Sequence, residues 1–283
     1  MFFSCTFVKS GWLMDASNMK KDVQKAKKDA FILFTGSDWD DVSQKLFKNN
    51  GKEKILYNKY GKDFLFYNVD ITKNEESTKT KILKYNYLLF SKYKVVELPY
   101  IAVRNVEGDV YFSEKVENIN NIDSVFKKIL EKKSYVENLK YKIKNAIGKE
   151  KTIAIDAFFS SIYNAESKAY DYLIEEAIKA DPNNESHLVG KFKLIKVALK
   201  ANSLALQKRY LQAADEYTIL LKEKDLTSEE RQNAWYQIAY LYAISKKIDN
   251  EKILYCLKNA INAFPQSDAV PRLQEIIKTI EKQ

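Results

Sequence analysis

The sequence predicts two domains of different class: an α/β domain over residues 12–133 and an all-α domain over residues 151–283. In the first part, short apolar runs alternate with amphipathic stretches, which is typical of strands that alternate with helices. From Ser134 onward, apolar residues recur at helical spacing throughout. With 283 residues, the chain is long enough for two domains that each bury a core.

The first half of the α/β part is expected to alternate helices and strands. A helix is expected within residues 15–28, where Val23 and Ala26 give an apolar face, and a strand follows at 31–34. The next helix should run from Asp41 to Asn49, with Gly51 as its stop. The continuous apolar run over residues 64–70 predicts a buried parallel strand.

The second half continues the alternation. A helix is expected over residues 75–93, followed by the segment 96–103, in which Pro99 stands just before a strand or at its first position. A glycine-containing turn at 105–109 leads into a strand at 110–112, and a closing helix is expected over 121–133.

The segment Phe34-Thr35-Gly36-Ser37-Asp38-Trp39 resembles the active-site loop of a thioredoxin-like domain of the Phe-Thr-Gly-Ser-Asp-Trp-Cys type. The resemblance covers residues 12–133 and includes Trp12 upstream of the first strand. In that family Cys-x-x-Cys comes next, and here Asp40 and Ser43 stand at the two cysteine positions. The resemblance also implies a cis peptide bond before Pro99, although any strand can begin with a proline.

These replacements argue against redox catalysis. Thiol–disulfide exchange needs an attacking thiolate and a second thiol, and the two cysteines, Cys5 and Cys256, are remote from the loop. Ser43 has no adjacent base to activate its hydroxyl. We expect Asp38, Asp40 and Asp41 to cap the helix that follows, and we predict no catalytic residue. The resemblance implies that an extended-peptide surface remains around three residues, namely Trp39, Leu98 and Pro99.

Residues 134–150 are expected to form a connecting helix. Ser134-x-x-Glu137 has the pattern of a capping box at its start, and Gly148 is placed as its stop.

Residues 151–283 resemble tetratricopeptide repeats, which are paired helices of about 34 residues. Trp235, Ile238, Ala239 and Tyr242 match the first helix of a repeat, and Thr227-x-x-Glu230 would cap it. Weaker copies lie at residues 154–182 and 197–217, and residues 270–280 predict the terminal helix that such an array needs. The expected architecture is therefore an α-helical solenoid after the thioredoxin-like domain.

The repeat resemblance implies that partners bind in a concave groove lined by first helices. The groove candidates on the strongest repeat are Asn233, Tyr236, Gln237 and Tyr240. A second set on an earlier helix is Lys193, Lys196 and Lys200. The repeat's own aromatic and small residues are expected to pack in the core.

Composition excludes several classes of function. The only histidine is His187, and the two cysteines are far apart, so no zinc site is predicted. No phosphate-binding loop or dinucleotide motif occurs, so no cofactor is expected. The net charge is +9, but arginine is scarce, so we favour a solvated lysine surface over nucleic-acid binding. No apolar run approaches the length of a membrane span.

Residues 1–11 form a separate N-terminal segment. Met1-Phe2-Phe3-Ser4-Cys5 resembles the end of a bacterial lipoprotein signal, which would make Cys5 a lipid attachment site and a membrane tether. Such a signal needs a basic start and about 7–15 apolar residues, which do not precede Cys5 here. An ordinary cysteine is therefore the preferred interpretation, and lipidation is the alternative.

These observations predict a non-catalytic interaction protein that holds a protein or peptide partner. The resembled thioredoxin branch is mostly exported in bacteria, so the periplasm or cell envelope is the expected location, with the cytoplasm as alternative. Two other functions stay open: a thiol-dependent redox or chaperone-type protein, and a binder of anionic surfaces or nucleic acid through the lysine-rich stretch 127–151.

Overall fold

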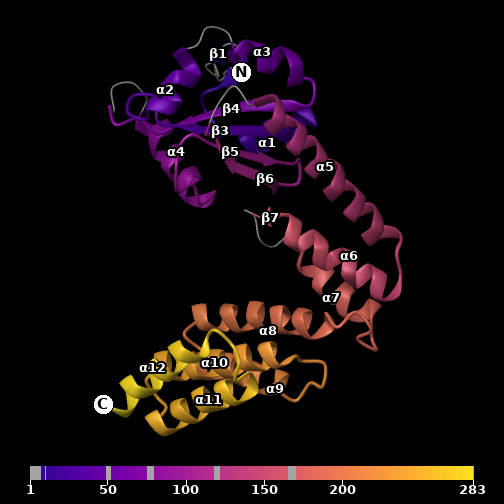
Figure 1. The fold of residues 1–283 in the computed structure, drawn as a ribbon, viewed down its shortest axis with the longest axis vertical. Coiled ribbons are helices and arrows are strands. Elements are labelled where there is room, and N and C mark those ends of the chain that lie inside the picture. Colours follow the sequence, from indigo (N-terminus) through magenta and orange to yellow (C-terminus); the bar gives the residue numbers. More distant parts are fainter. Residues whose placement is uncertain are drawn as a thin grey trace. The chain divides into compact units, whose positions relative to one another are not determined.

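The computed structural model describes residues 8–9, 11–48, 52–74, 80–117, 122–164 and 170–282. The described chain divides into two compact units. The first contains the residues up to Lys140 and those from Phe158 to Asn164; the second contains residues 141–157 and those from Tyr170 onward. Figure 1 labels the elements of both units along the chain.

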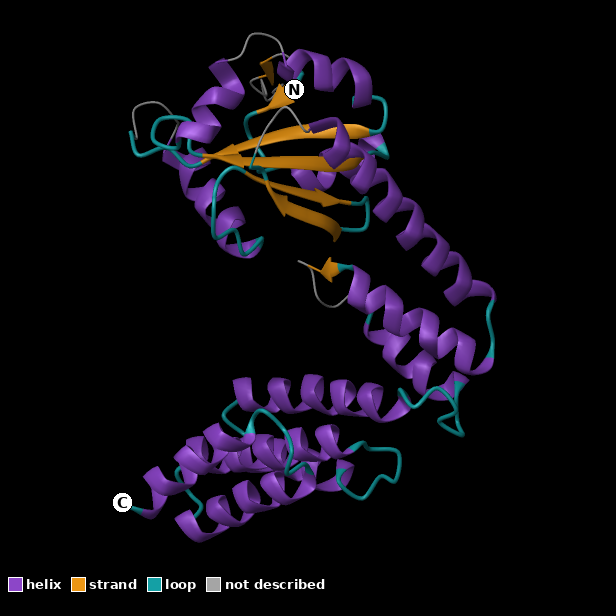
Figure 2. Ribbon diagram, in the orientation of Figure 1, coloured by secondary structure: helices purple, strands orange, loops and turns teal. Residues whose placement is uncertain are grey.

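The first unit is built on a seven-stranded mixed sheet with the order β1-β2-β4-β3-β5-β6-β7. β2, β4 and β3 run parallel, whereas β5 and β6 continue antiparallel from β3. Figure 2 shows the sheet in orange with helices around it. The strands are β1 Val8–Lys9, β2 Trp12–Leu13, β3 Asp29–Thr35, β4 Phe64–Asp70, β5 Tyr100–Arg104, β6 Asp109–Lys115 and β7 Tyr163–Asn164.

Helices cover both faces of this sheet. Helices α1 (Met19–Ala26) and α4 (Thr80–Lys92) pack on the face that carries Ile32, Phe34 and Tyr67. On the other face, Phe126 of α5 (Ile122–Asn145) stacks on Phe31 of β3, and α3 (Lys52–Tyr60) contacts Phe66 of β4 edge-on through Tyr57 and stacks on Phe126 through Tyr60. Helix α2 (Asp41–Lys48) follows β3 directly. The two apolar faces explain why β3 and β4 read as continuous apolar runs.

Most of the predicted elements of this unit are confirmed. The strand over residues 64–70 has the predicted bounds, and the predicted helix start at Asp41 is confirmed; the predicted helix end at Asn49 and the stop at Gly51 lie outside the described residues. The peptide bond between Leu98 and Pro99 is cis, as expected. Helix α3 was not predicted: its inward contacts come from Leu56 and two tyrosines, which give only weak apolar periodicity.

The prediction of a helix end at residue 133, with a new helix capped by Ser134, is wrong. Helix α5 runs without interruption from Ile122 to Asn145. Its buried residues continue in phase across the expected break, and no glycine or proline interrupts them. They are Val125, Phe126, Ile129, Val136, Leu139 and Ile143. Gly148 begins the next helix instead of ending this one.

The second unit is a run of helices that pack on their neighbours in chain order. Thr152 of α6 donates a hydrogen bond to the carbonyl of Ala177 in α7, which joins the first pair. These helices are α6 Gly148–Ser161, α7 Asp171–Ala180, α8 Val189–Leu206, α9 Tyr210–Leu220, α10 Ser228–Ser245, α11 Asn250–Ala263 and α12 Val270–Glu281. The part of the chain with known placement is thus mixed α/β followed by helices.

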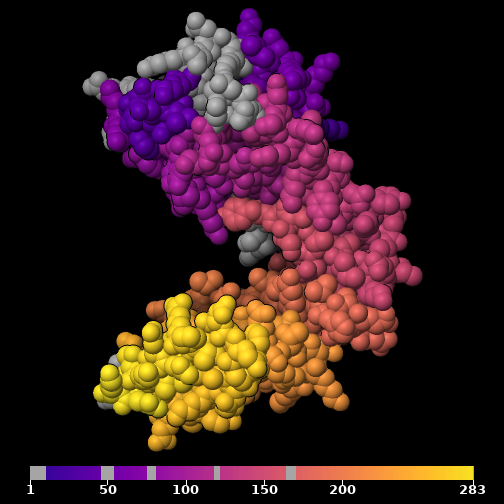
Figure 3. Space-filling view, viewed as in Figure 1, coloured from indigo at the N-terminus to yellow at the C-terminus, as the bar shows by residue number. Residues whose placement is uncertain are grey.

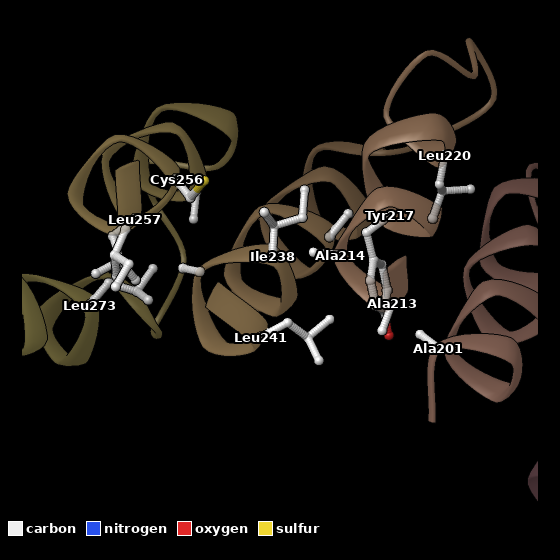
Figure 4. Close-up of a cluster of buried hydrophobic side chains, with 14 of the residues drawn as sticks. Ala201, Ala213, Ala214, Tyr217, Leu220, Ile238, Leu241, Cys256, Leu257 and Leu273 are labelled. Atoms are coloured by element: carbon white, nitrogen blue, oxygen red, sulfur yellow. The ribbon is translucent and has the colours of Figure 1, made fainter. Parts of the chain in front are cut away.

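A single apolar cluster joins α8 to α12 (Figure 4). Small residues let the helices approach closely: Ala213, Ala234 and Ala260 are all fully buried. The predicted capping box at the start of α10 is confirmed, because Thr227 and Glu230 exchange both hydrogen bonds. Trp235 and Tyr242, expected in the core, pack against this cluster while partly exposed.

Candidate functional site

A hydrogen bond joins the two residues that stand where the thioredoxin-like pattern has cysteines, Asp40 and Ser43. Asp40 Oδ2 accepts a hydrogen bond from the backbone N–H of Ser43 at 2.7 Å, which is the geometry of an N-cap. The hydroxyl of Ser43 is fully buried and accepts a hydrogen bond from the N–H of Gly36 at 3.1 Å. Both side chains are engaged in holding the start of α2, as expected for Asp40.

The rest of the loop is anchored to the end of β4 through Asp70. Asp70 Oδ1 accepts hydrogen bonds from the Thr35 hydroxyl and the Ser37 N–H, each at 2.9 Å. The Ser37 hydroxyl donates to Asp70 Oδ2. Asn86 of α4 donates to the backbone carbonyl of Asp70 at 2.9 Å. These hydrogen bonds therefore join the loop to the end of β4, which α4 contacts through Asn86.

Asp38 and Trp39 tie the loop to the chain after β4. Asp38 accepts hydrogen bonds from the N–H groups of Lys73 and Asn74. Partial burial alone would raise the pKa of Asp38, but these backbone donors lower it below its usual value. The Trp39 indole N–H donates to the Ile71 carbonyl at 2.6 Å, and the Lys73 ammonium lies 4.8 Å from the Trp39 ring centre. Asp38 therefore does not cap α2 as expected, because it bonds to the chain after β4; Asp40 caps α2.

Of the three residues expected to face a peptide, one is exposed. The Trp39 side chain is 40% exposed, whereas Leu98 and Pro99 are buried. Lys115 forms an ion pair with Glu97, next to the cis bond, and hydrogen bonding to Glu97 raises the pKa of Lys115. Any contact in this region would therefore rely on Trp39 and on charged neighbours.

The helical unit has a groove of about 360 Å³ between α10 and α12. Asn233, Tyr236 and Gln237 line it from α10, and Arg272 and Ile276 line it from α12. The floor includes buried Gln232, whose amide donates to the carbonyls of Ala260 and Phe264 at the end of α11.

A second groove, of about 350 Å³, lies on the other side of α10, against α8 and α9. Gln237 and Tyr240 line it from α10, and Asn202 and Leu206 line it from α8. Gln237 therefore belongs to both grooves. The four α10 residues expected in a groove all line one or both of these hollows, and no acidic or basic side chain lines the second.

A family model described as "Uncharacterised protein C-terminal domain" matches residues 188–283, which begin at the residue before α8. A curated relative, an "Uncharacterized protein" of Treponema pallidum (strain Nichols), is 27% identical over 287 residues, covering 98% of this chain and 91% of the relative. A solved structure titled "DsbH Oxidoreductase" has 18% identity and a TM-score of 0.35 over 44% of this chain and 88% of that one.

The second predicted groove set, the lysines of α8, is engaged in ion pairs. Lys193 bonds to Glu223 at 2.7 Å and to Asp225 at 2.6 Å. The remaining ion pairs of this set are Lys196 with Glu175 and Lys200 with Glu216. These lysines hold neighbouring helices and loops together, which accounts for them without a ligand.

Cys256 does not provide a reactive thiol. It is 3% exposed and lies in the apolar cluster of α10–α12 (Figure 4). Burial raises the pKa of its thiol to about 11, so the thiolate that would attack is scarce at neutral pH. Cys5, the predicted lipidation site, lies outside the described residues.

Most lysines of the stretch 127–151 also have acidic partners. The ion pairs are Lys127 with Glu131, Lys128 with Glu114, Lys133 with Asp29, Lys140 with Glu107 and Asp109, Lys149 with Glu185, and Lys151 with Glu176. Acidic side chains of the same chain therefore neutralise most of the positive charge of this stretch. In the described ranges, we find no group of three or more acidic, histidine or cysteine side chains that could hold a metal ion, and no helix able to cross a membrane.

Sequence reasoning missed the residues that α8 and α12 contribute to the grooves. Leu206 is 88% exposed and Arg272 is exposed, and both were overlooked because neither lies in a matched repeat position. A signal for the first was present: α8 carries apolar residues nearly all round, which is unusual for a helix with a solvated side.

Proposed function

We propose that this chain is a non-catalytic interaction protein whose helical unit binds an extended peptide segment across α10. In this proposal the first unit is a thioredoxin-like domain without redox thiols, and the second is a short tetratricopeptide-type solenoid. The observation that carries the proposal is the row of Asn233, Tyr236, Gln237 and Tyr240, which stands between two grooves of about 350 Å³ each.

The chemistry of this row suits a peptide backbone. A side-chain amide offers both donors and an acceptor, so Asn233, Gln237 and Asn202 can each pair with either backbone group of an extended segment. Apolar side chains, such as Leu241 and Ile276, form the adjoining walls and can accommodate the segment's apolar side chains. This combination of apolar surface with a few polar groups favours a peptide over a phosphate-rich ligand.

The thioredoxin-like assignment is supported by three features together. Helix α2 begins directly after the β3 loop, β3 pairs with parallel β4 and antiparallel β5, and the cis bond precedes β5. The solenoid assignment is supported by helix pairs α6–α7, α8–α9 and α10–α11, followed by α12. Asp40 and Ser43 at the cysteine positions favour the non-enzymatic interpretation.

The location in the cell envelope is part of the same proposal and rests on the sequence. Mass spectrometry of the native protein, combined with cell fractionation, tests it. A diacylglyceryl-modified Cys5 in the membrane fraction would support it, and an unmodified chain in the soluble fraction would contradict it.

Peptide binding can be tested with peptides selected on the full chain from a random phage-displayed library. Their affinity is then measured by fluorescence polarisation for wild type and for Tyr240→Ala and Gln237→Ala. Matched controls lie on α11: Tyr255→Ala removes a tyrosine of similar exposure, and Asn259→Ala removes an amide outside the grooves.

We expect each groove variant to weaken binding about tenfold, because truncating a well-placed contact costs on the order of 1–2 kcal/mol. The α11 controls should bind like wild type. Equal losses at Tyr240 and Tyr255, or selected peptides that bind the first unit, would contradict the proposed groove.

A further inference from the structure

The turn between α5 and α6, residues 141–149, exposes large apolar side chains. Ile147 is 85% exposed and Tyr141 is 69% exposed, whereas most isoleucines of the described chain are buried or half-buried. Exposure of such side chains to water is unfavourable in free energy, and burying them against a partner would be favourable. The turn therefore has apolar surface available for a partner.

The backbone directs these side chains away from the protein core. The buried residues of this part of α5 are Leu139 and Ile143, and Tyr141 is rotated about 160–200° from both along the helix. Gly148 has φ +58°, and a Cβ placed on it would meet nothing within 4 Å, so the apex of the turn is open. The space-filling view shows this turn at the surface (Figure 3).

The turn is also basic. Residues 138–149 contain four lysines and no acidic residue, and Glu150 is the first acid to follow. Lys142 and Lys144 are exposed and form no ion pair with the described part of the chain. Lys149 forms an exposed ion pair with Glu185 at 3.7 Å, and its charge also helps to lower the pKa of Asp181. Two of the three lysines of this turn, Lys142 and Lys144, therefore keep their positive charge without an acidic partner in the described part of the chain.

We propose that the α5–α6 turn docks on an anionic lipid surface. Ile147 enters the boundary between headgroups and acyl chains, and Tyr141 lies at the headgroup level, where tyrosine is enriched in membrane proteins. Lys142, Lys144 and Lys149 extend their ammonium groups to the lipid phosphates. The docking surface is separate from the grooves beside α10 and does not depend on them.

The apolar residues distinguish this partner from a nucleic acid. A phosphodiester backbone would attract the lysines, but it offers nothing apolar to cover Ile147, and the turn has no arginine for base contacts. A lipid interface satisfies both kinds of side chain at once.

The test is flotation of the full chain, produced without lipid modification, with two kinds of vesicle. One contains phosphatidylcholine alone, and the other contains phosphatidylcholine with 30% phosphatidylglycerol. We expect binding to the anionic vesicles, weakened by salt, and little binding to the neutral ones. Lys142→Gln with Lys144→Gln should weaken partitioning about 25-fold, at about fivefold for each lysine. Ile147→Ser should weaken it about tenfold.

Matched controls make the result specific. Val96→Ser removes an apolar side chain that is also 85% exposed, and Lys246→Gln with Lys247→Gln removes the same charge from another exposed loop. Both should bind like wild type, and circular dichroism should show all variants folded. The proposal is overturned if the full chain binds neither vesicle, if controls and turn variants lose binding equally, or if the turn variants lose affinity for single-stranded DNA but not for vesicles.

Discussion

Asp40 accepts a hydrogen bond from the backbone N–H of Ser43, so the two positions that would carry redox cysteines instead close the first turn of α2. A helix start favours a carboxylate for the same reason that it lowers the pKa of a cysteine: both gain from unpaired N–H groups and the helix dipole. At these two positions the side chains therefore stabilise the start of α2.

The cap should contribute measurably to stability. Asp40→Ala removes the acceptor for the Ser43 N–H and should lower the free energy of unfolding by about 1 kcal/mol. Asp40→Asn keeps an acceptor and should cost a few tenths of that. Urea denaturation followed by circular dichroism measures both; equal losses in the two variants would show that Asp40 acts through its charge alone.

Cysteines introduced at both positions should be able to form a disulfide. Residues three apart at a helix start have Cβ atoms about 5–6 Å apart, which is close enough for a small adjustment to bridge them. We expect Asp40→Cys with Ser43→Cys to form the bond on oxidation and to gain insulin-reductase activity that wild type lacks. A matched pair, Gln44→Cys with Lys48→Cys on the same helix, should gain no such activity; activity in wild type would refute the redox-inactive assignment.

The thiol of Cys256 should not react with thiol reagents in the folded protein. Because burial raises its pKa to about 11, only about one thiol in a thousand is ionised at pH 8. Titration with a chromogenic disulfide at pH 8 should leave Cys256 unmodified until urea unfolds the chain. Peptide mapping separates its signal from that of Cys5, and rapid labelling at Cys256 would disagree with the packing of the cluster.

The Lys193 ion pairs should stabilise the helical unit. Burial alone would lower the pKa of Lys193, but hydrogen bonds to Asp225 and Glu223 raise it. Lys193→Gln should lower the free energy of unfolding by about 1–2 kcal/mol at pH 7. The control is Lys224→Gln, which removes an exposed lysine that lies between Glu223 and Asp225 in the sequence. This substitution should change the free energy of unfolding little.

This contribution has a defined pH dependence. A raised folded-state pKa means that the stabilisation is fully present below the pKa of an unfolded lysine, about 10.4, and is lost as pH rises beyond it. The difference between wild type and Lys193→Gln should therefore be constant from pH 7 to 9 and shrink above pH 10.5. A difference that shrinks already between pH 7 and 9 would contradict the assignment.

The elements that could be predicted are those whose apolar pattern is strong on its own. Strand β4 is buried along most of its length, and its bounds follow from the sequence alone. Helix α3 could not be predicted because its tyrosines pack through their apolar rings but are treated as polar residues when apolar periodicity is assessed. The two residues of β7 are too short to leave a signal, and only pairing with Asp109 and Val110 defines them as a strand.

The same limit applies to the grooves. The α10 row could be placed from its offsets to Trp235 and Tyr242, because helix geometry fixes which residues lie between core positions. What α8 and α12 add depends on how three helices meet, and helix packing is a tertiary property. Arg272 and Leu206 therefore became visible only with the structure, and the binding role of the row stays a prediction.

Gln237 lines both grooves, so its side chain must fit the occupant of each groove at the same time. A substitution there that improves the fit on the α12 side also reshapes the α8 side. Under the proposed function, a mutation at this position would alter both grooves, so the two could not diversify independently. Adaptation to a new partner would have to proceed through the outer walls, on α8 and α12, while the shared position stays fixed.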